Sequence, residues 1–147
     1  MNKRFRRAID ALHPKFKRLV ECAPYTKGAA LPEKGVYLFN ENGKPIYVGR
    51  SNNIRRRYGD HTRPSSPTSL GILIARRELN LRPDYRAGAR KRLWADPKFK
   101  QAFERAKKRI IAMEFRAVEE SDQTRQALLE VYCAVTLRTP YNDFGNH

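Results

Sequence analysis

Residues 35–49 read GVYLFNENGKPIYVG, and this stretch decides the fold. Two runs rich in β-branched and aromatic residues, 36–39 and 46–48, flank the dipeptide Asn42-Gly43. Asn-Gly suits a type I′ turn, in which both central residues have positive φ. The stretch therefore predicts a β-hairpin with Tyr37 and Tyr47 roughly opposite each other. If their faces agree, two phenol groups lie side by side.

A basic helix is expected directly after the hairpin. Residues 50–61 read RSNNIRRRYGDH, with polar residues at 51–53 that can serve as the N-cap. Arg57 and His61 are four residues apart and so project from one helical face, while Arg50 points toward the same end of the hairpin. Phenol and imidazole groups can move protons, and guanidinium groups bind phosphate. These residue types are the parts of a phosphodiester-cleaving site.

Together these motifs resemble the GIY-YIG nuclease superfamily. The matching positions are the tripeptides 35–37 and 47–49, the pair Arg57 and His61, and the late residues Glu130 and Asn142. Val replaces Ile in both tripeptides, a mild change because both side chains are β-branched and apolar. The resemblance runs from residue 35 to about residue 142. It implies an α/β fold, a small three-stranded antiparallel sheet flanked by helices, with extra N-terminal and inserted helices.

Glu130 is the most informative acidic residue. It lies in an apolar helical pattern, and the residues three and four positions away carry no positive charge. Such an acid needs a charge partner from elsewhere, either a tertiary salt bridge to an arginine or a divalent cation. The resemblance implies the cation, with Glu130 as the sole protein carboxylate on one metal ion. Mg²⁺ is the expected ion and Mn²⁺ the alternative.

The resemblance also implies a reaction, the metal-dependent hydrolysis of DNA phosphodiester bonds by an endonuclease that uses one metal ion. Tyr37 is expected to orient or deprotonate the attacking water, and since a free phenol titrates near ~10 it needs help from a neighbouring arginine or metal-bound hydroxide. Tyr47 is expected to support water and phosphate, or simply to pack against Tyr37. Arg57 is expected to bind the phosphate, with a solvated helix face as the alternative.

The remaining site residues are expected to support this chemistry. His61 matches a proton-relay position, although a lone histidine is more often a packing or surface residue. Asn142 matches a residue that arranges the site, although Tyr-Asn-Asp alone would be turn chemistry. Gly35 and Gly49 belong to the two tripeptides. Arg50 is a weaker candidate site residue than Arg57.

The charge of the chain predicts a polyanionic partner. The net charge is +16, and residues 50–109 hold 18 Lys and Arg against 5 Asp and Glu, which is +13 of that total. Duplex DNA is the first expectation, and single-stranded DNA or RNA are the alternatives. Charge alone would equally fit a small ribosomal or structural protein with a solvated basic surface. The expected contacts are Arg50, Arg55, Arg56, Arg90, Lys91 and Arg92. Binding should depend strongly on salt.

The rest of the chain is assigned to helices and one strand. Residues 1–30 are predicted to form a helical extension that Pro14 interrupts. Its short helices pack on the domain with their basic faces outward, or alternatively form an arm that contacts DNA. Residues 31–147 form the nuclease domain, with a basic helical insert at about 65–110. One helix begins near Pro67, a second begins at Asp96-Pro97, a strand covers about 111–116, and Ser121 or Asp122 caps the last helix.

Cysteine content and hydropathy suggest a cytoplasmic protein without a membrane partner. Cys22 and Cys133 are too few and too far apart for a disulfide scaffold or a zinc site, and the apolar runs are short. A catalytically inactive or RNA-directed protein of the same fold is the alternative function. The target sequence, nicking against double-strand cleavage, the biological role and the oligomeric state stay open.

Overall fold

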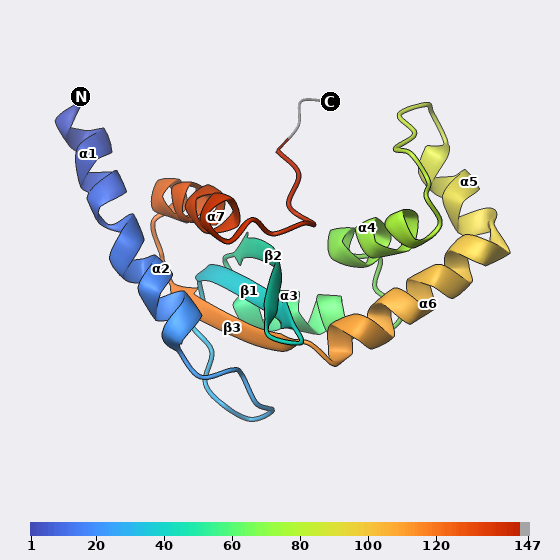
Figure 1. Cartoon of the computed structure of the whole chain (residues 1–147), viewed down its shortest axis with the longest axis horizontal. Coiled ribbons are helices and arrows are strands. Elements are labelled where there is room, and N and C mark those ends of the chain that lie inside the picture. The colour runs from blue at the N-terminus through green and yellow to red at the C-terminus, as the bar shows by residue number, and fades with distance from the viewer. Residues whose placement is uncertain (145–147) are drawn as a thin grey trace. The chain divides into compact units, whose positions relative to one another are not determined.

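The computed structural model describes residues 1–144, and the chain divides into two compact units. The first unit comprises residues 1–58 and the chain from residue 113 onward, and the second comprises residues 59–112. The elements, labelled in Figure 1, are α1 (Lys3–Asp10), α2 (Leu12–Glu21), β1 (Gly35–Glu41), β2 (Lys44–Ser51), α3 (Ile54–Thr62), α4 (Ser69–Glu78), α5 (Ala89–Ala95), α6 (Pro97–Ile111), β3 (Glu114–Glu119) and α7 (Gln123–Leu137). The boundary between the units falls within α3.

The three strands form one antiparallel sheet in the order β2-β1-β3, which confirms the predicted fold class. Asn42 and Gly43 have φ angles of 52° and 78°, the positive pair that a type I′ turn requires. Strand β3 pairs closely with β1 at Gly35, where a Cβ atom would overlap the carbonyl oxygen of Val118. Any larger residue at position 35 would therefore push the two strands apart.

The register of the hairpin differs from the one predicted. A shift between Phe39 and Asn40 places Tyr37 opposite Gly49 and Tyr47 opposite Phe39. The ring centroids of Tyr37 and Tyr47 lie 6.4 Å apart. The two tyrosines are thus diagonal neighbours, because the irregularity in the ladder offsets the pairing that counting from the turn suggests.

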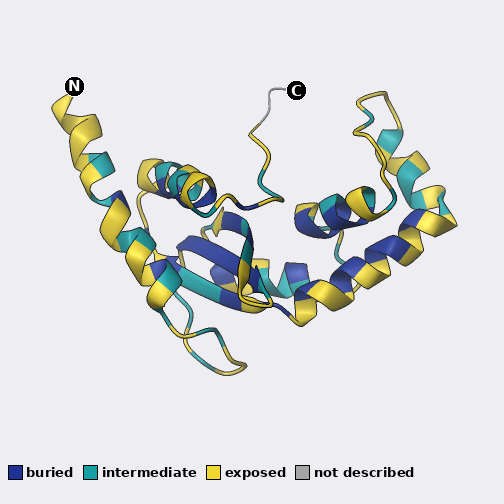
Figure 2. Cartoon of the chain, in the orientation of Figure 1, coloured by how far each residue is buried: buried dark blue, intermediate teal, exposed yellow. Residues whose placement is uncertain are grey.

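One face of the sheet is covered by α2 and α7 (Figure 1). Its core consists of Leu12, Leu19, Val36, Leu38, Val48, Val118, Leu129, Cys133 and Ala134. The strand residues of this set alternate along the chain, as expected of a strand with one apolar face on the helices. Figure 2 shows β1 buried along nearly its whole length, so both faces of this central strand are covered.

The other face of the sheet carries aromatic rings. Phe115 of β3 stands at the centre, with its ring centroid 5.0 Å from Phe39, 5.4 Å from Tyr37 and 4.6 Å from Tyr58 of α3. Tyr25 closes the cluster 5.1 Å from Tyr58. Phenol groups therefore replace aliphatic side chains on this face.

The second unit is a helical unit with its own core. Helices α4 and α6 pack through Ile72, Ala75, Phe99, Ala102 and Phe103. Helix α6 begins as predicted, because Asp96 accepts a hydrogen bond from the Lys98 amide at 2.9 Å and Pro97 occupies the first turn. In Figure 2 buried and exposed residues alternate along α6, which is the pattern of an amphipathic helix.

Two boundaries differ from the sequence expectation. Ile111, assigned above to a strand, is the last residue of α6 and is 50% exposed, since β3 begins only at Glu114. Pro14 does not interrupt the N-terminal helices but lies in the first turn of α2, where its missing N–H costs no helical bond. The break between α1 and α2 is at Ala11.

Helix α5 lies in the segment that the sequence predicts as a basic helical insert. Gly88 has a φ of 77° and stands at the N-terminus of α5, so it starts the helix rather than disrupting it.

Among the described residues, no helix is long and apolar enough to cross a membrane.

Candidate active site

The ring of Tyr37 lies across strand β2. Tyr37 is 1% exposed and pairs with Gly49, where a Cβ atom would overlap both Cζ and the hydroxyl oxygen of the tyrosine. Only a residue without a side chain leaves room for this ring. Gly49 is thus required by Tyr37, and the phenol oxygen is carried toward the edge strand of the sheet.

Burial decides the protonation of Tyr37. Burial raises the pKa of its hydroxyl far above the ordinary value, Tyr47 adds to that rise, and Arg57 opposes it through its charge and a side-chain hydrogen bond. The sequence suggested that an arginine would lower this pKa, and Arg57 does act in that direction. Because desolvation is the larger effect, Tyr37 is a neutral phenol around neutral pH.

Glu130 of α7 belongs to the same group. Burial raises the pKa of its carboxyl, and the charges of Arg50 and Arg57 oppose the rise. Glu130 in turn raises the pKa of Tyr37. The structure therefore brings together residues of β1, β2, α3 and α7, namely Tyr37, Tyr47, Arg50, Arg57 and Glu130.

The N-terminus of α3 is held in place by local hydrogen bonds. The Asn53 side-chain oxygen accepts a hydrogen bond from the main-chain amide of Arg56 at 3.1 Å. The main-chain amide of Asn53 donates to the Ser51 hydroxyl oxygen at 2.9 Å. Ile54 is fully buried, and its amide donates to the Glu33 carbonyl at 2.9 Å. Arg57 thus lies about one helical turn after the buried Ile54, which fixes the start of α3.

Asn142 extends the edge of the sheet. Its side chain accepts a hydrogen bond from the Val48 amide at 2.8 Å and donates one to the Val48 carbonyl at 2.7 Å. The Thr139 hydroxyl donates to the same Asn142 oxygen at 2.7 Å. Val48 lies between Tyr47 and Gly49, so Asn142 fixes β2 at the strand position that the site uses.

Two polar residues that the sequence reading missed join α7 to the segment before α3. The Gln126 amide donates to Asn52 Oδ1 at 3.1 Å and to the Glu120 carbonyl at 2.7 Å, and Gln123 exchanges hydrogen bonds of 2.7 and 3.2 Å with Asn52. Gln126 is 1% exposed and lies one turn before Glu130. A glutamine within the apolar pattern of the last helix was the available signal for this contact, since a buried amide needs hydrogen-bond partners.

The donor set suits one hard cation with few protein ligands. Among the described residues, no group of three or more His, Cys, Asp and Glu side chains could hold a metal ion. Glu130 offers a half-buried carboxylate at the edge of the tyrosine and arginine cluster. Mg²⁺ commonly binds through one or two carboxylates together with water and substrate phosphates. The residues present fit that mode.

His61 lies on α3 in the second unit and is buried. Its main-chain carbonyl accepts a hydrogen bond from the Lys107 ammonium at 2.9 Å, and Lys107 also donates to the Asp60 carbonyl at 2.9 Å and the Thr68 hydroxyl at 3.2 Å. Burial lowers the pKa of Lys107 to about 8, with Asp60 opposing and Arg63 adding to the effect. Lys107 therefore binds carbonyls at the C-terminal end of α3 that have no helical donor.

Of the six residues expected to contact nucleic acid, Arg50 lies on β2 and the other five lie on two helices. Arg55 and Arg56 are exposed on α3, and Arg90, Lys91 and Arg92 are exposed on α5 of the second unit. Arg92 also pairs with Asp84 at 2.9 Å, so part of its guanidinium is already used within the unit.

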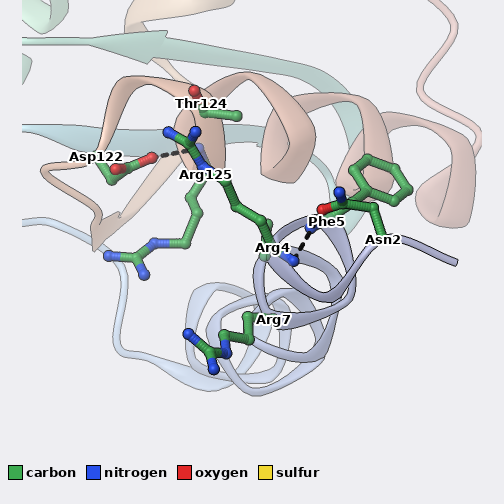
Figure 3. Close-up of a pocket in the computed structure, with 8 residues that line it drawn as sticks. Asn2, Arg4, Phe5, Arg7, Asp122, Thr124 and Arg125 are labelled. Carbon is green, nitrogen blue, oxygen red and sulfur yellow. Dashed lines mark hydrogen bonds between the residues drawn. The ribbon is translucent and has the colours of Figure 1, made fainter.

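A separate hollow of about 400 Å³ lies between α1 and the first turn of α7 (Figure 3). Its lining includes Arg4, Arg7 and Arg125 beside Phe5, which is 45% exposed. The lining shares no residue with the tyrosine and arginine cluster. The hollow thus adds positive charge to the first unit but is not the candidate catalytic site.

Comparison with known proteins gives a match to one family model. Neither a search of curated proteins nor a search of solved structures finds a match. A family model of the GIY-YIG catalytic domain matches residues 33–72, the segment that contains β1, β2 and α3. Together with the three-stranded sheet and the tyrosine pair, this match supports membership of the chain in the GIY-YIG nuclease superfamily.

Proposed function

We propose that this protein is a divalent-metal-dependent endonuclease that hydrolyses DNA phosphodiester bonds with a single metal ion. The observation that carries the proposal is the convergence of Tyr37, Arg57 and Glu130 at the edge strand of the sheet. A phenol, a guanidinium and a carboxylate from separate elements meet there, and each suits one task in phosphodiester hydrolysis. The match to a nuclease family supports the same conclusion.

Tyr37 assists the attack of water as a neutral phenol. Its raised pKa means that the hydroxyl keeps its proton at neutral pH, so it orients water by hydrogen bonding rather than acting as a ready base. Any loss of that proton would require a charge that outweighs burial. Tyr47, with its ring centroid 6.4 Å away, supports the water and the phosphate.

The arginines bind the phosphate that is cleaved. Arg57 is exposed and bonded to Tyr37, so one guanidinium can contact both a non-bridging phosphate oxygen and the phenol. Arg50 adds a second positive charge close to Glu130. Both cations favour the build-up of negative charge on phosphorus-bound oxygens during hydrolysis.

Glu130 would hold the divalent metal, Mg²⁺ or alternatively Mn²⁺. A cation bound there supplies Lewis-acid stabilisation of charge on the phosphate and on the leaving 3′ oxygen. Asn142 keeps β2 in position through Val48, and Gly35 and Gly49 allow the close packing of the strands and of the Tyr37 ring. His61 is assigned the proton relay on its sequence match alone.

Cleavage of supercoiled plasmid tests the proposal. The wild-type protein should convert the plasmid to nicked or linear DNA with Mg²⁺ and not with EDTA. Glu130→Ala and Tyr37→Phe should each abolish conversion and leave salt-dependent DNA binding intact. DNA binding without conversion would instead favour a binding module, and cleavage of RNA but not DNA would change the substrate.

A further inference from the structure

The segment between α4 and α5 presents an exposed aromatic ring among positive charges. Tyr85 is 70% exposed, and Arg82, Arg86, Arg90 and Lys91 around it in sequence are exposed as well. An exposed aromatic side chain is by itself ordinary on a protein surface. What distinguishes Tyr85 is the structure of the segment that carries it.

A network of ion pairs centred on Asp84 holds the segment. Arg86 binds both carboxylate oxygens, with Nε at 2.9 Å from Oδ1 and Nη2 at 3.0 Å from Oδ2. Arg92 of α5 reaches back to Oδ2 at 2.9 Å and to the Ala87 carbonyl at 2.8 Å. We call these contacts the Asp84 clamp.

The backbone around the clamp is also specialised. The Arg86 amide donates to Asp84 Oδ1 at 3.0 Å, and Gly88 has a φ of 77°. A Cβ atom at Gly88 would lie 3.3 Å from an Arg92 Nη1 atom, so the glycine leaves space for the guanidinium. The hydrogen bonds of both arginines hold the pKa of Asp84 well below its usual range, so the clamp stays charged at any pH used to assay a nuclease.

The clamp has a consequence for binding. It uses Arg86 and Arg92 to satisfy one carboxylate, and it leaves Arg82, Arg90 and Lys91 as exposed cations close to Tyr85 in the sequence. A planar ring among cations suits an unpaired nucleobase, because the base stacks and the neighbouring phosphates meet the positive charges. Holding the loop before binding reduces the entropy lost when the base stacks.

We propose that Tyr85 is a stacking residue for an unpaired base of the DNA substrate and that the Asp84 clamp positions it. The proposal deepens the proposed function, on which it rests for the identity of the partner. It predicts a preference for single-stranded or locally unpaired DNA over fully paired duplex, because bases inside a duplex already stack on each other.

Binding measurements in EDTA test this without cleavage. The full-length protein is titrated into a single strand with a central 2-aminopurine, into the paired duplex of that strand, and into the same sequence as RNA. Anisotropy gives the affinity, and 2-aminopurine quenching reports stacking. The variants are Tyr85→Ala, Tyr85→Phe and Asp84→Asn. Phe144→Ala removes an exposed ring elsewhere and serves as the control, since Phe144 is 54% exposed.

Tyr85→Ala should bind the single strand roughly tenfold more weakly and lose quenching, while its duplex affinity stays unchanged. Tyr85→Phe and the control should resemble the wild type, and Asp84→Asn should weaken single-strand binding with the ring still present. Single-strand affinity and quenching that are unchanged in Tyr85→Ala would overturn the proposal. Stacking that depends on Tyr85 in a protein that never cleaves DNA would overturn only the proposed activity. Binding of RNA but not DNA would overturn both.

Discussion

Tyr37 and Leu38 are neighbours on β1, are equally buried at 1% exposure, and face opposite sides of the sheet. Leu38 packs in the aliphatic core under α2 and α7, whereas Tyr37 packs against Phe115 and carries its hydroxyl to Arg57. The aliphatic face stabilises the fold by excluding water. The aromatic face does the same and also delivers a polar atom to the edge of the sheet.

The candidate active site therefore lies at the polar end of a packed core. An aromatic ring is long enough to be buried along its length and still present an oxygen at its tip. This comparison separates residues of one strand that stabilise the fold from residues that serve the reaction. The substitutions below test that separation, in order of their expected effect on the free energy of unfolding.

Leu38→Ala should have the largest effect. Removing a fully enclosed leucine leaves a cavity and should lower the free energy of unfolding by about 2–5 kcal/mol. Chemical denaturation measures this loss. DNA cleavage per folded molecule, assayed at a temperature where the variant is folded, should stay close to wild type. Loss of cleavage in the fully folded variant would show that the two faces are coupled.

Gly49→Ala should cost about 1–3 kcal/mol, because the added methyl group overlaps the Tyr37 ring and must displace it. The rate of DNA cleavage per folded molecule should also fall, because the displaced ring no longer holds its hydroxyl in place. Gly59→Ala is the matched control, since a Cβ atom at that helical position meets nothing within 4 Å. An active and stable Gly49→Ala protein would mean that the Tyr37 ring does not need to lie across β2.

Gln126→Met should cost about 1 kcal/mol, since it removes the hydrogen bonds that the Gln126 side chain donates to Asn52 Oδ1 and to the Glu120 carbonyl. Because Glu130 follows one turn later, divalent-cation binding should weaken as well, measured by Tb³⁺ luminescence in the absence of DNA. Thr136→Met, at an exposed position of α7, serves as the control. Weaker folding with unchanged cation binding would restrict Gln126 to a structural role.

Tyr37→Phe should change the free energy of unfolding by at most about 1 kcal/mol, because only the hydroxyl and its bond to Arg57 are lost. Plasmid cleavage should nevertheless disappear while DNA binding persists. Tyr58→Phe removes a phenol from the same aromatic face and should cleave normally. Cleavage by Tyr37→Phe would exclude the hydroxyl from the reaction.

The smallest expected effect is a shift along the pH axis. Burial raises the pKa of Glu130 above 4.5, and a protonated carboxyl does not bind a cation, so Tb³⁺ binding should be lost at a higher pH than for an ordinary glutamate. Arg57→Gln removes an opposing charge and should move the loss to still higher pH. The stability of the metal-free protein has the opposite pH dependence. Its folded state binds the Glu130 proton more tightly than the unfolded state does, so the fold gains stability as the pH falls. An unchanged binding profile in Arg57→Gln would contradict the coupling.

Local rules predicted the elements whose signals are local. The Asn42-Gly43 turn and the start of α6 at Asp96-Pro97 follow from residues within a few positions of each other. Asp122, one of two expected caps, accepts a hydrogen bond from the Arg125 amide at 2.9 Å. The strand expected at Ile111 failed because α6 continues its helical pattern to that residue. Local alternation of apolar residues is weaker evidence than an extended helical period.

The sequence by itself determined the resemblance to the GIY-YIG family, the hairpin and the residue types that gather at the candidate site, because turn chemistry and motif spacing are properties of the chain. Only the tertiary structure decided the register that sets Tyr37 over Gly49, the raised pKa of Tyr37 and of Glu130, and the partners of Gln126 and Lys107. Each of these depends on burial and on contacts between residues distant in sequence. Desolvation and long-range packing exist only once the chain has folded.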